Sequence, residues 1–272
     1  MRIGSKCVAS IGDHAHTAID GTPQQFAESM GYGTRQYASR ADFFAFHSGT
    51  WVRELHEVLR ELLDRRRSVI SIGSGECEHE IPFVLEGYDI LTTDVVDSAA
   101  QTRRLFPSLR FEMFDVLNPH PIGAFDDVLM TGLDFYFSDA DLSRIIANAR
   151  SLLRPDGRLL FALRYRDNTA TWLIDRVAIP AICALFRVAQ TVGVHKQRRT
   201  LKAHGYRRTP REVIRLAASH DFRLGRVRDA GFGVELTRIY VDRVVPRVYA
   251  AARAFDRRLH CFNNVIMFEF FA

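Results

Sequence analysis

The chain has 272 residues, of which 47% are hydrophobic and 25% charged, and its formal net charge is +5. This is ordinary globular composition with enough apolar material for a sizeable core. The four cysteines lie far apart and form no CxxC pair or His/Cys cluster. That pattern excludes a zinc-binding framework and a disulfide scaffold, and no metal site is expected.

The apolar segments give no sign of a secretory signal or a membrane span. The first residues contain no long apolar run. The richest apolar stretch, 171–194, contains Asp175, Arg176, Pro180 and Arg187, which a spanning helix does not readily carry at its centre. We therefore expect a cytoplasmic protein, with peripheral contact at a membrane as a further possibility.

The chain divides into an N-terminal arm or cap over 1–48 and a main domain over 49–272. Residues 1–35 are polar and weakly periodic, so only a short helix near 22–30 is expected. From Thr50 onward the pattern turns helical. The apolar residues that share one face of this helix are Trp51, Leu55, Val58, Leu59 and Leu62.

Strands and helices then alternate along the chain. Strands are predicted over 68–72, 89–94, 109–115, 125–132 and 158–163, and helices over 79–87, 97–105 and 138–153, with a turn at 154–157. Helices between strands imply right-handed crossovers and therefore a doubly wound, mostly parallel α/β sheet of the Rossmann-like type. In such a sheet, ligands bind beyond the carboxyl ends of the strands.

Beyond the fifth strand the alternation is interrupted by two amphipathic inserts, at about 164–208 and 233–260. We expect these helical inserts to lie over the carboxyl ends of the strands, where their apolar stripes are either core or the lining of an acceptor channel. Between them, a helix over 209–222 begins with Thr209 as N-cap and Pro210 in its first turn, and a strand follows over 222–232. The chain closes on a strong strand, 264–272.

A glycine turn follows the first strand, in the sequence SVISIGSGECEHE. Gly73 and Gly75 allow the backbone to approach a ligand where a Cβ atom would clash. A dinucleotide-binding turn needs a small residue at the position of Glu78, and an ATP-binding loop needs GK[ST], which is absent. S-adenosylmethionine (SAM) fits better, because it has no phosphates and its positive charges tolerate nearby acids.

Two acids stand at the ends of the next two strands. Asp94 ends the second strand, where a carboxylate can accept hydrogen bonds from both ribose hydroxyls, and Asp115 ends the third, where it can accept from an adenine amino group. The alternatives are an N-cap role for Asp94 and a solvated strand end for Asp115.

With these motifs, residues 66–165 resemble the class I SAM-dependent methyltransferases. VISIGSGEC stands for the family's glycine motif, TTD for its ribose motif and MFDV for its adenine motif. The resemblance implies that the final strand is antiparallel. It also implies that SAM is held by Gly73, Ser74 and Gly75 (methionine part), Asp94 (ribose), Asp115 and Val116 (adenine), and Thr131 and Gly132 (floor of the pocket), with Val95 as a further cofactor-binding residue.

This sequence departs from the family pattern at two positions. Ser71 stands where the glycine motif usually opens with an acid, so the ammonium group of the cofactor is expected to be held differently. Cys77 replaces the third glycine, which suggests a slightly wider turn, and we interpret it as a small packing residue.

The acceptor is less determined than the cofactor. The segment after the fourth strand reads GLDFYF and has no prolines, which argues against the (N/D/S)PP(Y/F) tetrad of enzymes that methylate base or amide nitrogens. An oxygen atom on a small-molecule, saccharide or lipid-linked acceptor is therefore favoured. The candidate lining residues are Tyr136, Arg164, Tyr165 and His204, with Tyr37 and Trp51 closing the pocket from the N-terminal side, and no catalytic base is assigned.

The segment 195–211 holds seven Lys or Arg residues and no acid. It is either a solvated face or a site for an anionic acceptor or membrane surface. Its single aromatic, Tyr206, offers little stacking surface, which argues against nucleic acid as a partner. The alternative functions are an RNA methyltransferase that uses this segment, and a degenerate methyltransferase fold that serves as a scaffold.

Overall fold

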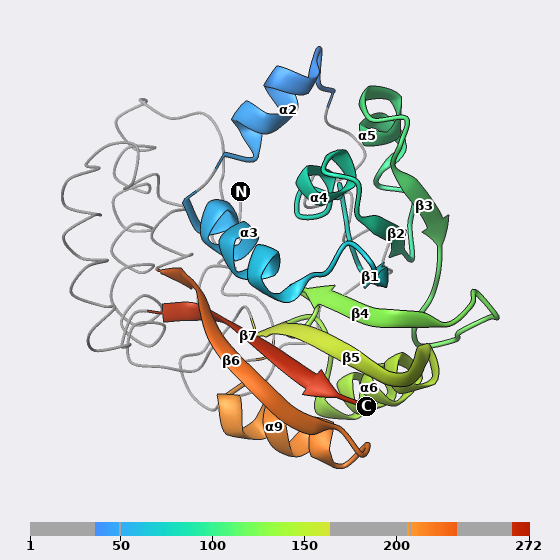
Figure 1. Cartoon of the computed structure of the whole chain (residues 1–272), viewed down its shortest axis with the longest axis vertical. Helices are drawn as coiled ribbons and strands as arrows, with labels where there is room; N and C mark the ends of the chain where they lie inside the picture. Colours follow the sequence, from blue (N-terminus) through green and yellow to red (C-terminus); the bar gives the residue numbers. More distant parts are fainter. Residues whose placement is uncertain (1–35, 49, 164–205, 207, 233–262) are drawn as a thin grey trace, which may run out of the picture.

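Apolar strands build a twisted sheet with helices on both faces in the computed structural model, which describes residues 36–48, 50–163, 206, 208–232 and 263–272 (Figure 1). The strands are β1 (Ser68–Ile72), β2 (Asp89–Asp94), β3 (Arg110–Met113), β4 (Phe125–Thr131), β5 (Leu153–Leu163), β6 (Arg223–Phe232) and β7 (Asn263–Phe271). The helices are α2 (Arg40–Phe46), α3 (Thr50–Leu62), α4 (Ile81–Leu85), α5 (Ala100–Leu105), α6 (Asp139–Ser151) and α9 (Pro210–Ala218).

The described strands form one seven-stranded sheet in the order β3-β2-β1-β4-β5-β7-β6. Strands β1 to β5 pair in parallel, and β7 is antiparallel to both β5 and β6. The predicted doubly wound sheet with an antiparallel C-terminal strand is therefore confirmed. The strand order reverses next to β1, so ligand chemistry is expected at its carboxyl end.

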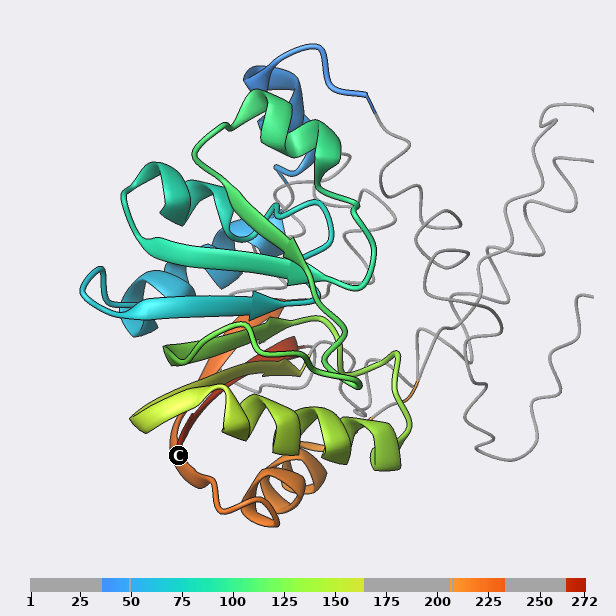
Figure 2. The ribbon, with the colours of Figure 1, turned by 90° about the vertical axis from the view of Figure 1, so that its right-hand side faces the viewer.

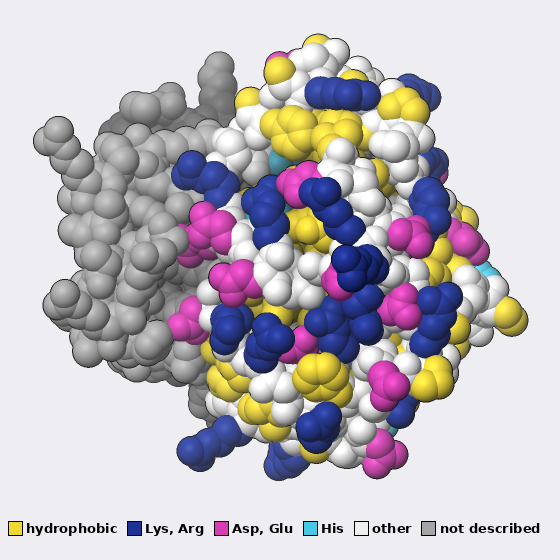
Figure 3. Space-filling view, viewed as in Figure 1, with side chains coloured by type: hydrophobic (Ala, Val, Ile, Leu, Met, Phe, Trp, Pro, Cys, Tyr) yellow, Lys and Arg dark blue, Asp and Glu magenta, His cyan; other side chains and the backbone are white. Residues whose placement is uncertain are grey.

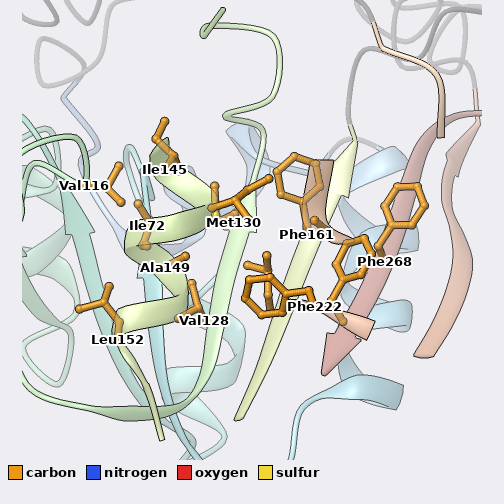
Figure 4. Close-up of a cluster of buried hydrophobic side chains, with 14 of the residues drawn as sticks. Ile72, Val116, Val128, Met130, Ile145, Ala149, Leu152, Phe161, Phe222 and Phe268 are labelled. Carbon is orange, nitrogen blue, oxygen red and sulfur yellow. The ribbon is translucent and has the colours of Figure 1, made fainter. Parts of the chain in front are cut away.

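Two hydrophobic cores cover the two faces of the sheet, and alternation along β5 shows how they are divided. Leu159, Phe161 and Leu163 pack on the side of α6 and α9, whereas Leu160 and Ala162 pack on the side of α3 and α4. This is the two-residue period of a strand that is buried on both faces. Figure 2 shows α6 and α9 together on one side of the sheet, and Figure 4 shows side chains of the first core.

The predicted helix caps are confirmed. The Ser138 hydroxyl accepts a hydrogen bond from the Asp141 backbone N–H at 3.1 Å and so caps α6. At the start of α9, Thr209 and Glu212 form a reciprocal capping box, with Pro210 in the first turn. Each cap satisfies backbone N–H groups that have no partner within the helix.

The predicted turn at 154–157 lies within β5 as an irregularity. Phe125 pairs with Leu153 and Asp127 pairs with Arg158, so the residues in between bulge out of the β4–β5 ladder. Asp156 takes a positive φ of 62° there. An aspartate tolerates this left-handed backbone better than most residues, which explains how the strand continues through the turn.

The N-terminal segment 36–48 packs onto the main domain. Tyr37 and Phe43 are buried in a third core cluster together with Cys77, Ile81 and Phe106. The arm is therefore joined, over these residues, to the segment that carries the glycine turn. The predicted helix near 22–30, the insert 233–260 and most of the insert 164–208 lie outside the described residues.

None of the helices within the described residues is long and apolar enough to cross a membrane. On the face seen in Figure 3, basic and acidic side chains are interspersed. This arrangement agrees with exposed or half-exposed pairs such as Arg60 with Glu86 at 2.8 Å and Arg154 with Asp126 at 3.0 Å.

A buried ion network ties β4, β5 and β7 together at the end of the sheet opposite the glycine turn. The Arg158 guanidinium binds both carboxylate oxygens of Asp127, at 2.9 and 2.6 Å, and Glu269 Oε1 at 2.8 Å. Arg67 Nε adds a further hydrogen bond to Asp127 at 3.0 Å. Asp127 and Glu269 are almost fully buried, so their charges depend on these arginines.

Replacing Arg158 by Leu should therefore lower the free energy of unfolding by about 3–5 kcal/mol, because it leaves two buried carboxylates without their shared partner. Urea denaturation measures this loss. The control is Arg154→Leu, which removes an exposed arginine of the same strand and should cost less than about 1 kcal/mol. Equal losses in the two variants would contradict a stabilising role for the network.

Candidate functional site

The turn after β1 depends on left-handed backbone angles. Gly73 has φ 69°, Gly75 has φ 55° and Cys77 has φ 64°. A Cβ atom on Gly73 would lie 2.3 Å from Leu133 Cδ2, so the side chain from the loop after β4 occupies the space that the glycine leaves. Cys77 keeps the left-handed conformation that a third glycine would adopt, with its side chain fully buried as a packing residue.

Asp94 holds the glycine turn against the end of β2. Its Oδ2 accepts a hydrogen bond from the Gly75 backbone N–H at 2.8 Å, and its Oδ1 accepts from the Val96 N–H at 3.4 Å. The Ser74 N–H binds the Thr93 carbonyl oxygen at 2.9 Å. The alternative role for Asp94, as a helix N-cap, is wrong for α5, because Ala99 takes the N-cap position without a side-chain cap.

Burial raises the pKa of Asp94, while hydrogen bonds from backbone N–H groups, first of all that of Gly75, lower it. The carboxylate keeps further lone pairs beyond those used by Gly75 and Val96. It can therefore still accept hydrogen bonds from a ligand such as a ribose hydroxyl.

Two large apolar side chains are exposed at the carboxyl ends of β2 and β3. Val95 follows Asp94 and is 41% exposed, and Met113, which is paired with Asp94 in register, is 59% exposed. Exposed apolar side chains beside a polar strand end suit a flat heterocycle such as adenine. Met113 was not singled out from the sequence, because its exposure depends on where β3 ends.

The adenine residues expected after β3 have local partners. Asp115 Oδ1 accepts from the Leu117 N–H at 2.9 Å, and Asp115 Oδ2 accepts from Asn118 Nδ2 at 2.7 Å. Val116 is buried in the core beside α6. Asp115 thus stabilises its own turn, and its contact with adenine stays a prediction.

The loop after β4 lies against the glycine turn, and the role of Thr131 and Gly132 as a pocket floor stays a prediction. Thr131 is buried, and Gly132 takes a positive φ of 95°, which turns the chain so that Leu133 lies over Gly73. Tyr136 is half-buried and its ring lies 3.9 Å, centroid to centroid, from that of Phe135. Arg164, Tyr165 and His204, together with the side chain of Trp51, lie outside the described residues.

The loop after β4 is fixed by an arginine that sequence reasoning did not single out. Arg208 is buried and donates hydrogen bonds to the backbone carbonyls of Asp134 and Phe137 and to the carboxylate of Asp139, the last at 2.9 Å. Arg208 belongs to the basic segment 195–211, in which no local signal distinguishes it from its neighbours. At least this charge serves the fold and is not part of a solvated face.

Residues 36–48 reach the glycine turn through a polar cluster. The Tyr37 hydroxyl donates to Glu76 Oε2 at 2.8 Å, and His47 Nε2 lies 3.0 Å from that hydroxyl and 3.5 Å from Glu76 Oε2. Glu76 is buried and directly follows Gly75. Tyr37 therefore closes on the glycine turn from the N-terminal side, and His47 joins it.

A second buried acid, Glu80, lies behind the turn. Its Oε1 accepts a hydrogen bond from the Ser71 hydroxyl at 2.6 Å, and its Oε2 has no hydrogen-bond partner within the described residues. Burial raises the pKa of Glu80 to about 8, and the charge of Glu78 adds to the rise. Burial also raises the pKa of the Cys77 thiol, with a contribution from Glu80, which makes Cys77 a poor nucleophile.

The described residues contain no group of three or more His, Cys, Asp or Glu side chains that could hold a metal ion. The site instead offers a glycine turn, carboxylates and exposed apolar side chains at the carboxyl ends of β1, β2 and β3. These groups suit a nucleoside that carries positive charge, because they provide acceptors for hydroxyls and amines without a cation for phosphate.

Comparison with solved structures identifies the fold. The chain superposes on magnesium protoporphyrin IX methyltransferase (ChlM) of Synechocystis PCC 6803, determined with bound SAH, with a TM-score of 0.53 and 12% identity, over 92% of this chain and 94% of that one. The chain has the fold of the class I SAM-dependent methyltransferases.

Two further structures with the class I methyltransferase fold agree. They are 1,6-didemethyltoxoflavin-N1-methyltransferase of Burkholderia thailandensis (TM-score 0.53, 15% identity, 93% of this chain and 92% of that one) and the pyocyanin biosynthetic protein PhzM (0.54, 17%, 92% and 67%). No family model matches the sequence, and no curated protein matches it.

Gly73→Ala should lower the free energy of unfolding by more than Gly87→Ala. Both glycines have positive φ, at 69° and 87°, so each alanine carries about 1–2 kcal/mol of backbone strain. Only at Gly73 does the added methyl group also collide with Leu133, since nothing lies within 4 Å of the corresponding position at Gly87. Urea denaturation compares the two, and equal losses would refute the close packing of Leu133 on the turn.

Glu80→Gln should change how stability depends on pH. A carboxyl with a raised pKa stabilises the fold while protonated, and this contribution is lost as pH rises from about 4.5 to about 8. The wild type should therefore lose about 1.4 kcal/mol per pH unit relative to Glu80→Gln within that window. Ser71→Ala, which removes a donor to the ionised form, should extend the loss to higher pH. Parallel denaturation profiles for wild type and Glu80→Gln would contradict the assignment.

Proposed function

We propose that this chain is a SAM-dependent methyltransferase that acts on a small-molecule acceptor. The observation that carries the proposal is the contact of Asp94 with the Gly75 N–H at 2.8 Å, which brings a carboxylate and a left-handed glycine turn together at the strand-order reversal. The fold supports it, since the structures compared above include methyltransferases with bound SAH.

The residues proposed to bind the cofactor fall into three groups, according to the part of SAM that each would contact. Gly73, Ser74 and Gly75 would face its methionine part, Asp94 would accept from the ribose hydroxyls, and Val95 with Met113 would contact the adenine. Asp115, Val116, Thr131 and Gly132 complete the predicted set. SAM supplies a methyl group that is already activated on a sulfonium, so this chain needs chiefly to orient the acceptor and exclude water.

The acceptor would meet the methyl group beside the loop after β4. Leu133 lies over Gly73, and Tyr136 lies on the same loop, which Arg208 holds through two backbone carbonyls. The cap over 1–48 would close the other side through Tyr37. Oxygen is the proposed acceptor atom, because the segment GLDFYF lacks the prolines that accompany methylation of base and amide nitrogens.

The class of acceptor rests on the proteins that share the fold. Two of the compared proteins are named as methyltransferases of magnesium protoporphyrin IX and of 1,6-didemethyltoxoflavin, which are small molecules. Transfer of a tritiated methyl group from SAM into an extract of the source cell tests the proposal. The tritium label is expected in a small-molecule product, which is then identified. Label in RNA would favour the RNA-methylating alternative, and the lack of SAM binding in calorimetry would favour a scaffold.

Asp94→Asn should weaken SAM binding by about 1–3 kcal/mol, because the amide can still accept from Gly75 but can no longer accept at both atoms. Isothermal titration calorimetry measures the change, and thermal denaturation checks that the fold is kept. The matched control is Asp97→Asn, an exposed acid three residues further on that pairs with Arg103. Unchanged affinity in Asp94→Asn would remove the ribose assignment.

A further inference from the structure

A buried polar cluster beneath the glycine turn suggests how the cofactor's charge is met. Ser71 on β1 and Asp94 at the end of β2 face the same side of the sheet as Glu80, which directly precedes α4. The hydroxyl of Ser71 lies 2.6 Å from Glu80 Oε1, and Ser71 is only two residues before Gly73. The Glu80 carboxyl is thus attached to the strand that leads directly into the turn.

A buried acid in this position lowers the stability of the fold unless a partner compensates for its burial. Glu80 is fully buried, and its Oε2 has no hydrogen-bond partner in the described part of the chain. A buried carboxyl group with an unsatisfied oxygen destabilises a fold by some kilocalories per mole, and a glutamine or an apolar residue would avoid the charge. Within the described part of the chain, the second oxygen of this carboxyl is thus left for a ligand to pair with.

The sequence motif indicates what that partner is. Ser71 occupies the position at which the glycine motif ordinarily begins with an acid, and this serine donates its hydrogen bond to the Glu80 carboxyl. The carboxyl that is missing from the strand is therefore present in space, contributed by the segment that follows the turn. Two positions that look unrelated in the sequence form one unit.

We infer that Glu80 supplies the negative charge that meets the cationic methionine part of SAM, and that it releases its proton to solvent as the cofactor binds. This inference rests on the proposed function and assigns a residue to it that the motif does not contain. The Ser71 hydroxyl stabilises the ionised form by donating to it.

The electrostatic surroundings explain why a cationic ligand should have this effect. Glu78 and Asp94 both raise the pKa of Glu80, after the larger effect of burial, and only hydrogen bonds lower it. On α3, His56 lies near the backbone of Glu78 and is neutral at pH 7, because burial and then Arg60 lower its pKa to about 4. The Cys77 thiol stays protonated. A bound cation would thus be the charge that favours ionisation, in a poorly solvated region where charges interact strongly.

Glu80 would respond differently to the cofactor and to its product. Beside its carboxylate, SAM carries a sulfonium and an ammonium group, whereas SAH carries the carboxylate and the ammonium group without the sulfonium. SAH should therefore favour ionisation of Glu80 less strongly and release fewer protons when it binds. Re-protonation of Glu80 after methyl transfer would then weaken product binding.

Calorimetric titration of SAM in phosphate and in Tris, whose ionisation enthalpies differ, counts the protons released. At pH 7 a carboxyl with a pKa of about 8 is about nine-tenths protonated, so the wild type should release up to about 0.9 proton more than Glu80→Gln. The difference between the two proteins cancels the titration of the ligand's own amino group. Between pH 6 and pH 7, the affinity of the wild type for SAM should rise about tenfold relative to that of Glu80→Gln.

A double variant that exchanges the positions of the hydroxyl and the carboxyl tests the role of Glu80 by a gain of affinity as well as by a loss. Ser71→Asp combined with Glu80→Ser returns the carboxyl to the strand and should recover SAM affinity that Glu80→Gln loses. If Glu80→Gln does not fold, the comparison of SAM with SAH on the wild type decides, and equal proton release by both ligands overturns the inference.

The outcomes separate the two proposals. SAM binding with the same proton release and affinity in wild type and Glu80→Gln overturns the role of Glu80 and leaves the proposed function standing. No measurable binding of SAM to the wild type overturns both.

Discussion

The hydrogen bond from the Gly75 N–H to Asp94 is the interaction on which the site depends. It joins the turn after β1 to the end of β2, at 2.8 Å, and it requires the left-handed backbone that Gly73 and Gly75 provide. Leu133 then fills the space above Gly73, which brings the loop after β4 to the same place. The ends of β1, β2 and β4 meet there because the Asp94 carboxylate binds the turn and the two glycines leave room for close backbone approach.

Buried acids are treated differently at the two ends of the sheet. At one end, Asp127 and Glu269 share Arg158, and their charges are neutralised within the protein. At the other end, burial raises the pKa values of Glu80 and Asp94, which are held by hydroxyl and backbone donors. The first arrangement stabilises the fold. The second leaves buried carboxyls whose ionisation a bound cation would favour.

Much of the fold was predictable, because short patterns of apolar, turn and capping residues mark where its strands and helices begin and end. The strand boundaries at Ser68–Ile72 and Asp89–Asp94 follow from short apolar runs between turns, and Ser138 and Thr209 mark helix starts by their side-chain chemistry. Gly73, Gly75 and Asp94 were identified for the same reason, since a glycine turn and an acid at a strand end are short motifs with a physical meaning.

The sequence by itself determined the order of strands and helices, the glycine turn and the acid at the end of the second strand, because each is marked by a short local pattern. Only the tertiary structure decided that Ser71 holds Glu80, that Tyr37 and His47 reach Glu76, and that Arg208 fixes the loop after β4. These contacts join residues whose separation in the sequence carries no periodic signal. Their hydrogen bonds form only once packing has brought the segments together and removed water from between them.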